Sequence, residues 1–454
     1  MRGELARTRC FSYICSVNRF ERCPSGTHFS CVQRSIVKTF LPTRSYRREI
    51  SAKNASPLMK IESFSIQNYK CIKDLSVDCR GADGEIRQWT VLLGENNTGK
   101  TNVLRALALL EPEEFNLQGL DKAFVPSILR RDRDLIQLYY ETFLKLEVKL
   151  ENGEEWLFDP RKIQSFNFDP QIRLFGYGVS RYPARTVFDE FPFLSTDTLF
   201  SPYARLLDLQ NWLLLLDYSA KHDSVIADRR LQWMRELVQS NLFPGLKDFC
   251  FEKAGENDNV VAKFVTEHDG NVSFEGLGFG YQTSLTWLAD FCKRMFELYP
   301  KSKNPLQEEA VVLVDEIDLH LHPKWQRDLV PTLSKIFPNV QFIVTTHSPH
   351  VLQSMADVNL YVLRRDETSG EITVERSDVT DFTGWTVEDI LSVTMELGED
   401  VLSIAYNAVK KEFEEAIRNK NRQKAQQCYD RLDEMMRPGN PMRSIYRVRL
   451  EEMA

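Results

Sequence analysis

The stretch Gly94-Glu95-Asn96-Asn97-Thr98-Gly99-Lys100-Thr101 decides the fold of this chain. It fits the phosphate-loop pattern G-x-x-x-x-G-K-[ST] at every fixed position. The apolar residues 89–93 before it predict a buried strand, and residues 102–110 after it are rich in helix formers. Because the pattern binds phosphate where a strand runs through a glycine loop into a helix, the sequence predicts a nucleotide-binding α/β domain.

Each part of this loop has a physical reason to contact a phosphate. Gly94 and Gly99 allow the backbone to fold tightly, and the helix start directs free N–H groups and its dipole at negative charge. Lys100 would neutralise the β- and γ-phosphates of ATP, and the Thr101 hydroxyl would bind Mg²⁺. The residues expected to hold ATP form one continuous run: Gly94, Glu95, Asn96, Asn97, Thr98, Gly99, Lys100, Thr101 and Asn102.

The composition is that of an ordinary globular protein. The chain has 454 residues, of which 43% are hydrophobic and 27% are charged. Its longest apolar run, near residues 212–216, is far too short to span a membrane. The net charge of −7 argues against a basic nucleic-acid binder, although composition does not exclude a local basic groove. The cysteines after residue 58 are scattered, which favours reduced thiols in the cytoplasm.

Residues 1–58 differ from the rest of the chain. They hold 11 Lys and Arg against 3 Asp and Glu, a balance of +8, which leaves −15 for the remainder. Their Arg-rich, acid-poor composition is compatible with a transit peptide. We prefer a disordered extension or a start codon assigned too far upstream. The segment lacks a hydrophobic period, and a regular hydrophobic pattern begins only at Met59. Its four cysteines lack the paired spacing of a zinc site.

Hydrophobic spacing predicts the elements around the loop. Residues 61–77 alternate as a bent strand, and residues 143–148 and 171–178 read as further strands. Residues 200–241 have the spacing of two amphipathic helices whose apolar stripes face a core. Residues 249–272 return to a strand pattern.

A second set of polar residues follows buried strands, as a nucleotide site requires. Residues 311–314 form a short apolar run that predicts a parallel strand, and Asp315 and Glu316 stand at its end. Asp315 would bind Mg²⁺, and Glu316 would deprotonate the attacking water. The next strand, residues 341–346, ends at His347, which could hydrogen-bond a γ-phosphate. With Lys100, these two residues, Glu316 and His347, are the expected catalytic groups.

Between the two sets, Gly278 and Gly280 open a helix-forming run and offer a second anion-binding helix start. The order along the chain is then phosphate loop, glycine-rich helix start, acidic strand end, Asp318 and His347. Together with the opening strand at residues 66–72, this order resembles the ABC-type ATPases of the SMC, RecF and OLD grouping. The resemblance covers about residues 59–360.

The resemblance implies an α/β ABC-ATPase head with a mixed sheet, an antiparallel β subdomain and a helical subdomain at about residues 200–245. A C-terminal helical module would follow over residues 361–454. It also implies that two subunits sandwich two ATP molecules, with the signature loop at residues 277–282 of one chain facing the phosphate loop of the other. Gly278 stands where that loop usually has serine, which implies slow hydrolysis. Residues 177–181 fall where the Q-loop would be, without a glutamine.

The C-terminal tail narrows the resemblance. Residues 384–391 precede expected helices near residues 398–418 and 420–436, and a last short helix follows Pro441. This is similar to the tails of stand-alone bacterial ATPases of anti-phage defence, of the Septu and retron-linked types, which commonly work beside a separately encoded nuclease. A hairpin that only caps the domain is the alternative. The basic run at residues 418–424 fits a solvated helix junction or a contact to DNA or RNA.

Several functions are compatible with these patterns. We prefer a cytoplasmic ATPase that dimerises around Mg-ATP and controls a nuclease or other effector in anti-phage defence. A RecF- or SMC-like DNA repair ATPase is the main alternative, although the long heptad arms of a full SMC protein are absent from the sequence. A transporter's nucleotide-binding subunit is disfavoured by the opening strand and the tail. Gly278 keeps open a scaffold that binds ATP and barely hydrolyses it.

Overall fold

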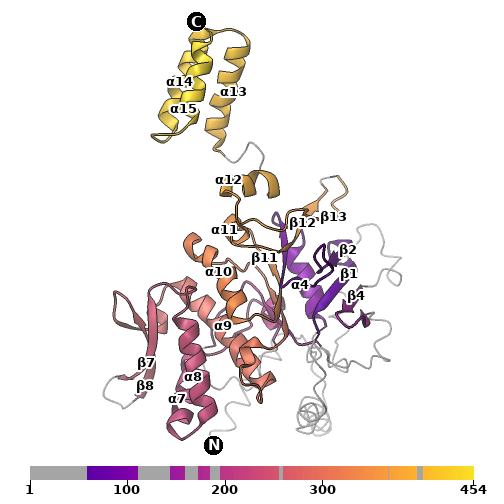
Figure 1. The fold of residues 1–454 in the computed structure, drawn as a ribbon, viewed down its shortest axis with the longest axis vertical. Helices are drawn as coiled ribbons and strands as arrows, with labels where there is room; N and C mark the ends of the chain where they lie inside the picture. The colour runs from indigo at the N-terminus through magenta and orange to yellow at the C-terminus, as the bar shows by residue number, and fades with distance from the viewer. Residues whose placement is uncertain are drawn as a thin grey trace, which may run out of the picture. The chain divides into compact units, whose positions relative to one another are not determined.

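The computed structural model describes residues 59–110, 144–158, 172–184, 195–254, 259–366, 368–395 and 402–453 (Figure 1). Residues 1–58, expected to be a basic extension, lie outside these ranges, so that expectation stays a prediction. Within the ranges given, no helix is both long enough and apolar enough to cross a membrane.

A six-stranded sheet holds the phosphate loop. Its strand order is β13-β12-β3-β11-β10-β6, and all neighbours are parallel except the antiparallel pair β12 and β13. Every residue of β10 and β11 is buried, as expected of parallel strands that are covered on both faces. The strands span Trp89–Gly94 (β3), Leu174–Tyr177 (β6), Ala310–Val314 (β10), Val340–Thr345 (β11), Asn359–Arg365 (β12) and Ile372–Arg376 (β13).

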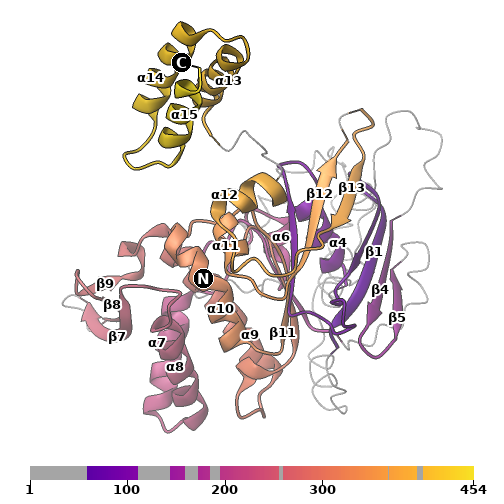
Figure 2. The ribbon, with the colours of Figure 1, turned by 45° about the horizontal axis from the view of Figure 1, so that its top comes forward.

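The two faces of this sheet contribute to two separate cores. Along β10, Val311 and Leu313 join a core with helix α4 (Lys100–Ala108), because successive strand residues point to opposite faces. Val312 and Val314 join the other core, which contains residues of helices α9 (Phe279–Leu298) and α10 (Pro323–Ile336) (Figure 2). Helices on both sides therefore bury the strands whose ends form the candidate site.

A four-stranded antiparallel sheet packs into the α4 core. Its order is β2-β1-β4-β5, and Figure 2 shows β1 beside β4. The buried amide of Gln341 joins it to β11 through two 2.8 Å hydrogen bonds with the backbone of Ile61, one accepted from N–H and one donated to C=O. The strands span Ile61–Tyr69 (β1), Ile72–Asp78 (β2), Lys145–Leu150 (β4) and Glu155–Phe158 (β5). This sheet is the expected antiparallel β subdomain.

Two helices and three strands form a further subdomain. Helices α7 (Leu209–Lys221) and α8 (Val225–Val238) fall within the residues where the sequence predicts two amphipathic helices. Asp208 and Ser224 cap them, each accepting a hydrogen bond from a backbone N–H of the first turn. A separate antiparallel sheet follows, with β7 over Leu246–Ala254, β8 over Asn259–Thr266 and β9 over Asn271–Ser273.

The chain after β11 contains short elements and a final set of three helices. The short ones include α11 (Pro349–Gln353), α12 (Val387–Asp389) and a π-helical turn at Ile390–Thr394, whereas the short helix α6 (Asp197–Phe200) lies earlier in the chain, between β6 and α7. Helices α13 (Ile404–Arg418), α14 (Arg422–Met435) and α15 (Met442–Glu451) have a core of their own. Residue 361, the expected start of the C-terminal module, falls inside β12, so the six-stranded sheet extends past that boundary. The expected helix near residues 398–418 begins later, at Ile404.

Candidate nucleotide-binding site

The phosphate loop runs from the end of β3 to the start of α4. Gly94 and Gly99 both have a positive φ, 151° and 90°, which favours glycine. A Cβ at Gly94 would lie 2.4 Å from the carbonyl oxygen of Leu363, so the loop also depends on glycine for space. Gly99 caps α4 without any side-chain hydrogen bond. The first N–H groups of α4 therefore have no side-chain cap at Gly99 and are available to an anion.

Neighbouring segments hold the rest of the loop in place. Arg365, at the end of β12, donates to the carbonyl oxygen of Asn97 from Nη2 at 2.6 Å and from Nε at 3.1 Å. The Thr98 hydroxyl donates to the carbonyl oxygen of Glu95 at 2.8 Å. The Asn102 side chain donates to Cys71 Sγ at 3.3 Å. The loop is thus tied to β12 and to the β1–β2 turn as well as to itself.

Lys100 extends back along the loop. Its Nζ donates to the carbonyl oxygens of Gly94 at 2.8 Å and Glu95 at 2.7 Å. Burial lowers the pKa of this ammonium below its ordinary value, while the carboxylates of Asp315, Glu316 and Glu95 act to raise it. A buried cation that donates to these two neutral carbonyls would gain from a phosphate group, because charged partners form stronger hydrogen bonds.

A network of hydroxyl and carboxylate groups joins three elements at the ends of the strands. The Thr101 hydroxyl donates to Asp315 Oδ2 at 2.8 Å, which links α4 to the end of β10. Thr345, the last residue of β11, donates to Asp315 Oδ1 at 2.7 Å. Asp315 is almost completely buried, and both of its carboxylate oxygens accept hydrogen bonds. Oxygen ligands of this kind suit Mg²⁺, which takes its remaining ligands from water and nucleotide phosphates. The pair Thr101 and Asp315 therefore fits the expected metal site.

Glu316 adopts an unusual backbone conformation at this edge. Its φ is 47°, in the left-handed region that residues other than glycine seldom occupy. Its N–H donates to the Thr345 hydroxyl at 2.7 Å, the same hydroxyl that donates to Asp315. Burial lowers the pKa of both Lys100 and His347, and the Glu316 carboxylate lies near enough to both side chains to oppose that lowering. The structure thus brings together Lys100, Thr101, Asp315, Glu316 and His347, as the sequence predicts.

His347 follows β11, and its side chain is exposed. Burial of the ring lowers the pKa of His347, and the Lys100 charge lowers it further, against the opposing effect of Glu316, Asp318 and Asp315. The ring is therefore neutral at pH 7 and can offer one nitrogen as a donor and the other as an acceptor. Beside it, the Thr346 hydroxyl donates to Asp318 Oδ1 at 2.5 Å, which connects this strand end to the loop after Glu316.

The two glycines of the signature loop lie at the start of α9. Gly278 is the N-cap residue, and no side chain caps the helix there. Gly280 lies so close to the loop after Glu316 that an added Cβ would be 2.3 Å from the carbonyl oxygen of His320. A Cβ at Gly278 would only meet Tyr281 at 3.6 Å, an ordinary contact. Gly280 is thus required for packing, whereas the backbone at Gly278 would accept a side chain.

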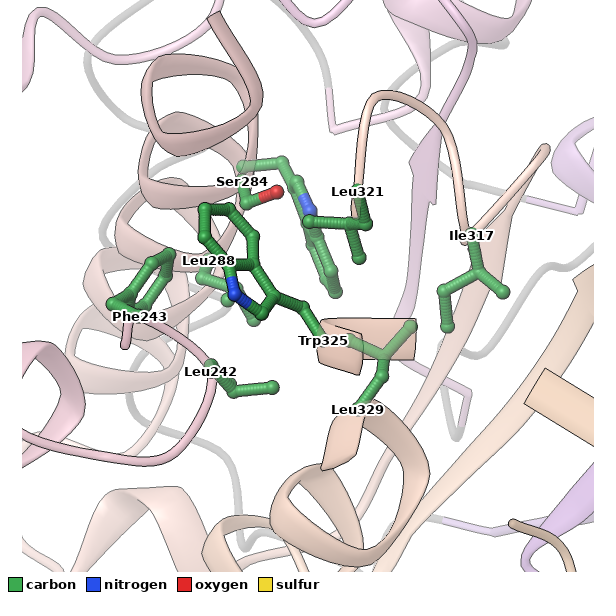
Figure 3. A pocket seen from close by; sticks show the side chains of 9 residues that line it. Leu242, Phe243, Ser284, Leu288, Ile317, Leu321, Trp325 and Leu329 are labelled. Atoms are coloured by element: carbon green, nitrogen blue, oxygen red, sulfur yellow. The ribbon is translucent and has the colours of Figure 1, made fainter. Parts of the chain in front are cut away.

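Mainly apolar side chains pack α9 against the loop after Glu316 and against the start of α10. Figure 3 shows Ser284 and Leu288 of α9 facing Leu321, Trp325 and Leu329 around a small pocket. The Trp325 ring also packs at 4.5 Å from the ring of Tyr281. The start of α9 and the loop that follows Glu316 are therefore parts of one packed unit.

Some residues of the site were not predicted. Thr345 lies at the end of a predicted strand, but no motif indicates that its hydroxyl bridges Asp315 and Glu316. Arg365 lies more than 260 residues after the phosphate loop, and only the pairing of β12 with β3 brings it there. Arg181, in the segment that falls where the Q-loop would be, is buried and donates to the backbone just after β10. A single sequence carries no signal for such long-range contacts.

Comparisons with known proteins agree with this geometry. Residues 89–353 match the family described as "AAA domain, putative AbiEii toxin, Type IV TA system". Septu protein PtuA of Bacillus thuringiensis is 33% identical over 402 residues, which cover 84% of this chain and 98% of that protein. This chain belongs to the same AAA-domain family as Septu protein PtuA. The prediction of a defence-type ATPase relative is confirmed, and the family implies nucleotide binding.

Other relatives match over shorter stretches. Septu protein PtuA of Bacillus mycoides (strain KBAB4) is 26% identical over 68% of this chain, and the match spans 41% of that relative. Retron Ec83 probable ATPase of Escherichia coli is 32% identical over 43% of this chain and 34% of its own length. Among solved structures, an SMC head bound to the C-winged helix domain of ScpA has a TM-score of 0.40 and 14% identity, covering 70% of this chain and 98% of that one.

Proposed function

We propose that this chain binds Mg-ATP, dimerises around it and hydrolyses it, and that this cycle controls a separately encoded nuclease or other effector in bacterial anti-phage defence. One observation carries the proposal. The Thr345 hydroxyl bridges Asp315 and the backbone of Glu316, while Thr101 of the phosphate loop donates to the same Asp315. The phosphate loop, the metal-binding pair and the expected base are thereby fixed relative to one another within one chain.

The residues of this chain have distinct roles in the proposed reaction. Lys100 and the N–H groups that begin α4 bind and orient the phosphates. Thr101 and Asp315 would hold Mg²⁺, which when bound neutralises charge on the phosphate oxygens. Glu316 orients a water molecule and accepts its proton as the water oxygen bonds to the γ-phosphorus and the bond to the bridging oxygen of ADP breaks. Neutral His347 hydrogen-bonds the γ-phosphate.

A second copy of the chain would complete each site. The start of α9 offers uncapped N–H groups at Gly278 beside the exposed side chain of Phe279. In the proposed dimer these groups face the γ-phosphate bound by the other copy, where the positive end of the helix stabilises negative charge. Because Gly278 offers no hydroxyl, only backbone N–H groups make this contact, and we expect slow hydrolysis. Slow hydrolysis suits a switch in which bound ATP holds the dimer together.

The biological role in this proposal comes from the relatives. The Septu protein PtuA of Bacillus thuringiensis matches this chain across nearly its whole length, and the match covers 84% of this chain. The three final helices have their own core, as a module that contacts a partner would need. A nuclease or other effector protein is the partner that we propose for it. DNA or RNA could bind as well, in the cell interior where ATP is available.

The substitution Glu316→Gln tests the proposal directly. Glutamine keeps the shape and loses the base, so the variant should bind Mg-ATP, hydrolyse it at least about a hundredfold more slowly and accumulate as dimers. Nucleotide binding, phosphate release and mass by light scattering would be measured with and without Mg-ATP. Glu297→Gln, which removes an exposed carboxylate paired with Lys293 on α9, is the matched control and should behave like the wild-type protein.

Two results would count against parts of this proposal. A Glu316→Gln protein that stays monomeric in saturating Mg-ATP would rule out the ATP-held dimer. A pull-down of that variant from its own host, with Mg-ATP present throughout, would test the role. A co-eluting nuclease that depends on ATP supports it, whereas DNA without any protein partner would favour the repair-type ATPase.

A further inference from the structure

Arg181 is a buried cation beside the expected base. It lies in the segment that follows β6, and only 2% of its surface is exposed. Its Nε donates to the carbonyl oxygen of Gly178 at 2.8 Å. Its Nη2 donates to the carbonyl oxygen of Glu316 at 2.9 Å and also to that of Asp315. All three of these acceptors are backbone carbonyls, so this side chain holds the backbone of two segments in place.

This guanidinium remains charged although it is buried. Burial lowers the pKa of Arg181 to about 10, while the nearby carboxylates of Asp315, Asp318 and Glu316 act to raise it. The group therefore stays protonated at neutral pH. It also lies over the ring of Trp287 in α9, 5.8 Å from the ring centre, where a cation is favourable. The side chain thus contacts the segment after β6, the turn after β10 and helix α9.

These contacts fix the peptide that joins Asp315 to Glu316. Arg181 holds the C=O of this peptide, and the Thr345 hydroxyl accepts a hydrogen bond from its N–H. The same peptide leads into the left-handed conformation of Glu316, whose φ is 47°. Such a conformation is energetically unfavourable for a residue other than glycine and persists only where the surroundings enforce it. Without Arg181, the turn could relax and redirect the Glu316 side chain.

We propose that Arg181 is a positioning residue for hydrolysis, which holds the Asp315–Glu316 turn so that the Glu316 carboxylate stays directed at the attacking water. It would take the place of the glutamine that is missing from residues 177–181. Since its three acceptors, the carbonyl oxygens of Gly178, Asp315 and Glu316, lie outside the phosphate loop, we expect its effect to fall on the chemical step. This inference rests on the proposed ATPase function.

Kinetics of three variants test the inference. Arg181→Met removes the donors and keeps an apolar stem, so kcat for ATP hydrolysis should fall about a hundredfold, the size of effect that a misplaced catalytic group produces. The dissociation constant of Mg-ATP should change less than about threefold, because its binding groups are elsewhere. Arg181→Lys, which keeps a cation and can reach one carbonyl, should recover part of kcat. Arg205→Met is the matched control, since Arg205 lies over the Tyr182 ring nearby and donates to the carbonyl oxygen of Ala204, away from the Asp315–Glu316 turn.

Chemical rescue and hydrogen exchange separate positioning from general structural support. Millimolar guanidinium should restore turnover to Arg181→Ala, and it should not restore turnover to Glu316→Gln. In Arg181→Met, the backbone amide of Glu316 should exchange faster with deuterium, while the phosphate-loop amides keep their wild-type rates. Loss of Mg-ATP binding in parallel with kcat, or unchanged kcat, would overturn the inference. If the wild-type chain does not hydrolyse ATP, the proposed function is wrong, and unchanged exchange at Glu316 would then overturn the inference independently.

Discussion

The two parts of the proposed nucleotide site differ in how far a single chain completes them. Around the phosphate loop, Thr101, Asp315 and Thr345 form hydrogen bonds that connect α4, β10 and β11. At the signature loop, Gly278 and Gly280 offer backbone only, and the start of α9 has no capping side chain. Hydrogen bonds within one chain connect the residues of the first part, whereas the second presents backbone N–H groups that no side chain caps.

This difference separates the expected effects of substitutions. Changes around the phosphate loop should alter binding or chemistry in a folded monomer, because the network does not depend on a second copy. At the signature loop, substitutions at positions that contact the same chain should alter packing. Substitutions at positions that face the other copy in the proposed dimer should alter turnover. A substitution of Gly280, which lies against His320, should therefore alter packing, whereas a substitution of Gly278 should alter turnover.

The largest effect should come from Lys100→Ala. Lys100 Nζ is the only side-chain cation that we place on the phosphates, and charge-assisted hydrogen bonds contribute about 1.5–3 kcal/mol each. We expect Mg-ATP to bind roughly a hundredfold more weakly, which titration calorimetry would measure. Lys221→Ala, which removes an exposed ion pair with Asp217, is the control and should bind ATP normally. Wild-type affinity in Lys100→Ala would place the nucleotide elsewhere.

A smaller and opposite pair of effects should come from serine at the two signature glycines. Gly280→Ser forces a Cβ against the His320 carbonyl oxygen, so it should destabilise the protein by about 1–3 kcal/mol. In Gly278→Ser the added side chain meets only an ordinary contact. Serine is also a better N-cap than glycine, so the substitution should stabilise α9 by about a few tenths of a kcal/mol. It also supplies the missing hydroxyl, so turnover should rise.

Thermal unfolding and phosphate release would measure this pair in parallel. If both variants lost the same stability, the start of α9 would not be fixed by the loop after Glu316. If Gly278→Ser left turnover unchanged while the protein dimerised, the hydroxyl of a signature serine would have no role in this chain. Because the substitution is the same at both positions, the intrinsic effect of adding serine is common to the two results.

The sequence predicts the part of the site that local patterns define. The phosphate loop is a continuous motif, and Asp315 and Glu316 follow a fully apolar run that predicts a buried parallel strand, which the structure contains as β10. Parallel strands end at the same edge of a sheet, so the approach of Asp315 to Thr101 follows once the strands are recognised. The α7 and α8 pair is also predicted, because its apolar stripes repeat at the helical period.

Contacts between distant segments were beyond this reasoning. β12 and β13 were expected in a helical module, yet they extend the six-stranded sheet, because an apolar strand can pair with either domain and its sequence does not specify which. Arg365 then reaches Asn97 only because β12 pairs with β3. Arg181 stands in an irregular loop, where its burial depends on the ends of other strands.

The smallest expected effect concerns His347, the exposed member of the assembled part of the site. Burial and the Lys100 charge lower its pKa below the ordinary value of about 6.5, so the folded protein disfavours the imidazolium form. Between the lowered pKa and 6.5, the unfolded chain binds more protons, and the stability of the folded chain should fall as the pH falls through this window. His347→Gln should lose this part of the pH dependence.

Carbon-13 NMR of histidine-labelled protein would measure the pKa directly, with His347→Gln identifying the signal. Mg-ATP should raise the pKa, because phosphate oxygens beside the ring would favour its charged form. A pKa that ATP does not move would place His347 away from the γ-phosphate. The assembled part of the site would then end at Glu316, and only the phosphate loop and the Asp315–Glu316 turn would act on the nucleotide from this chain.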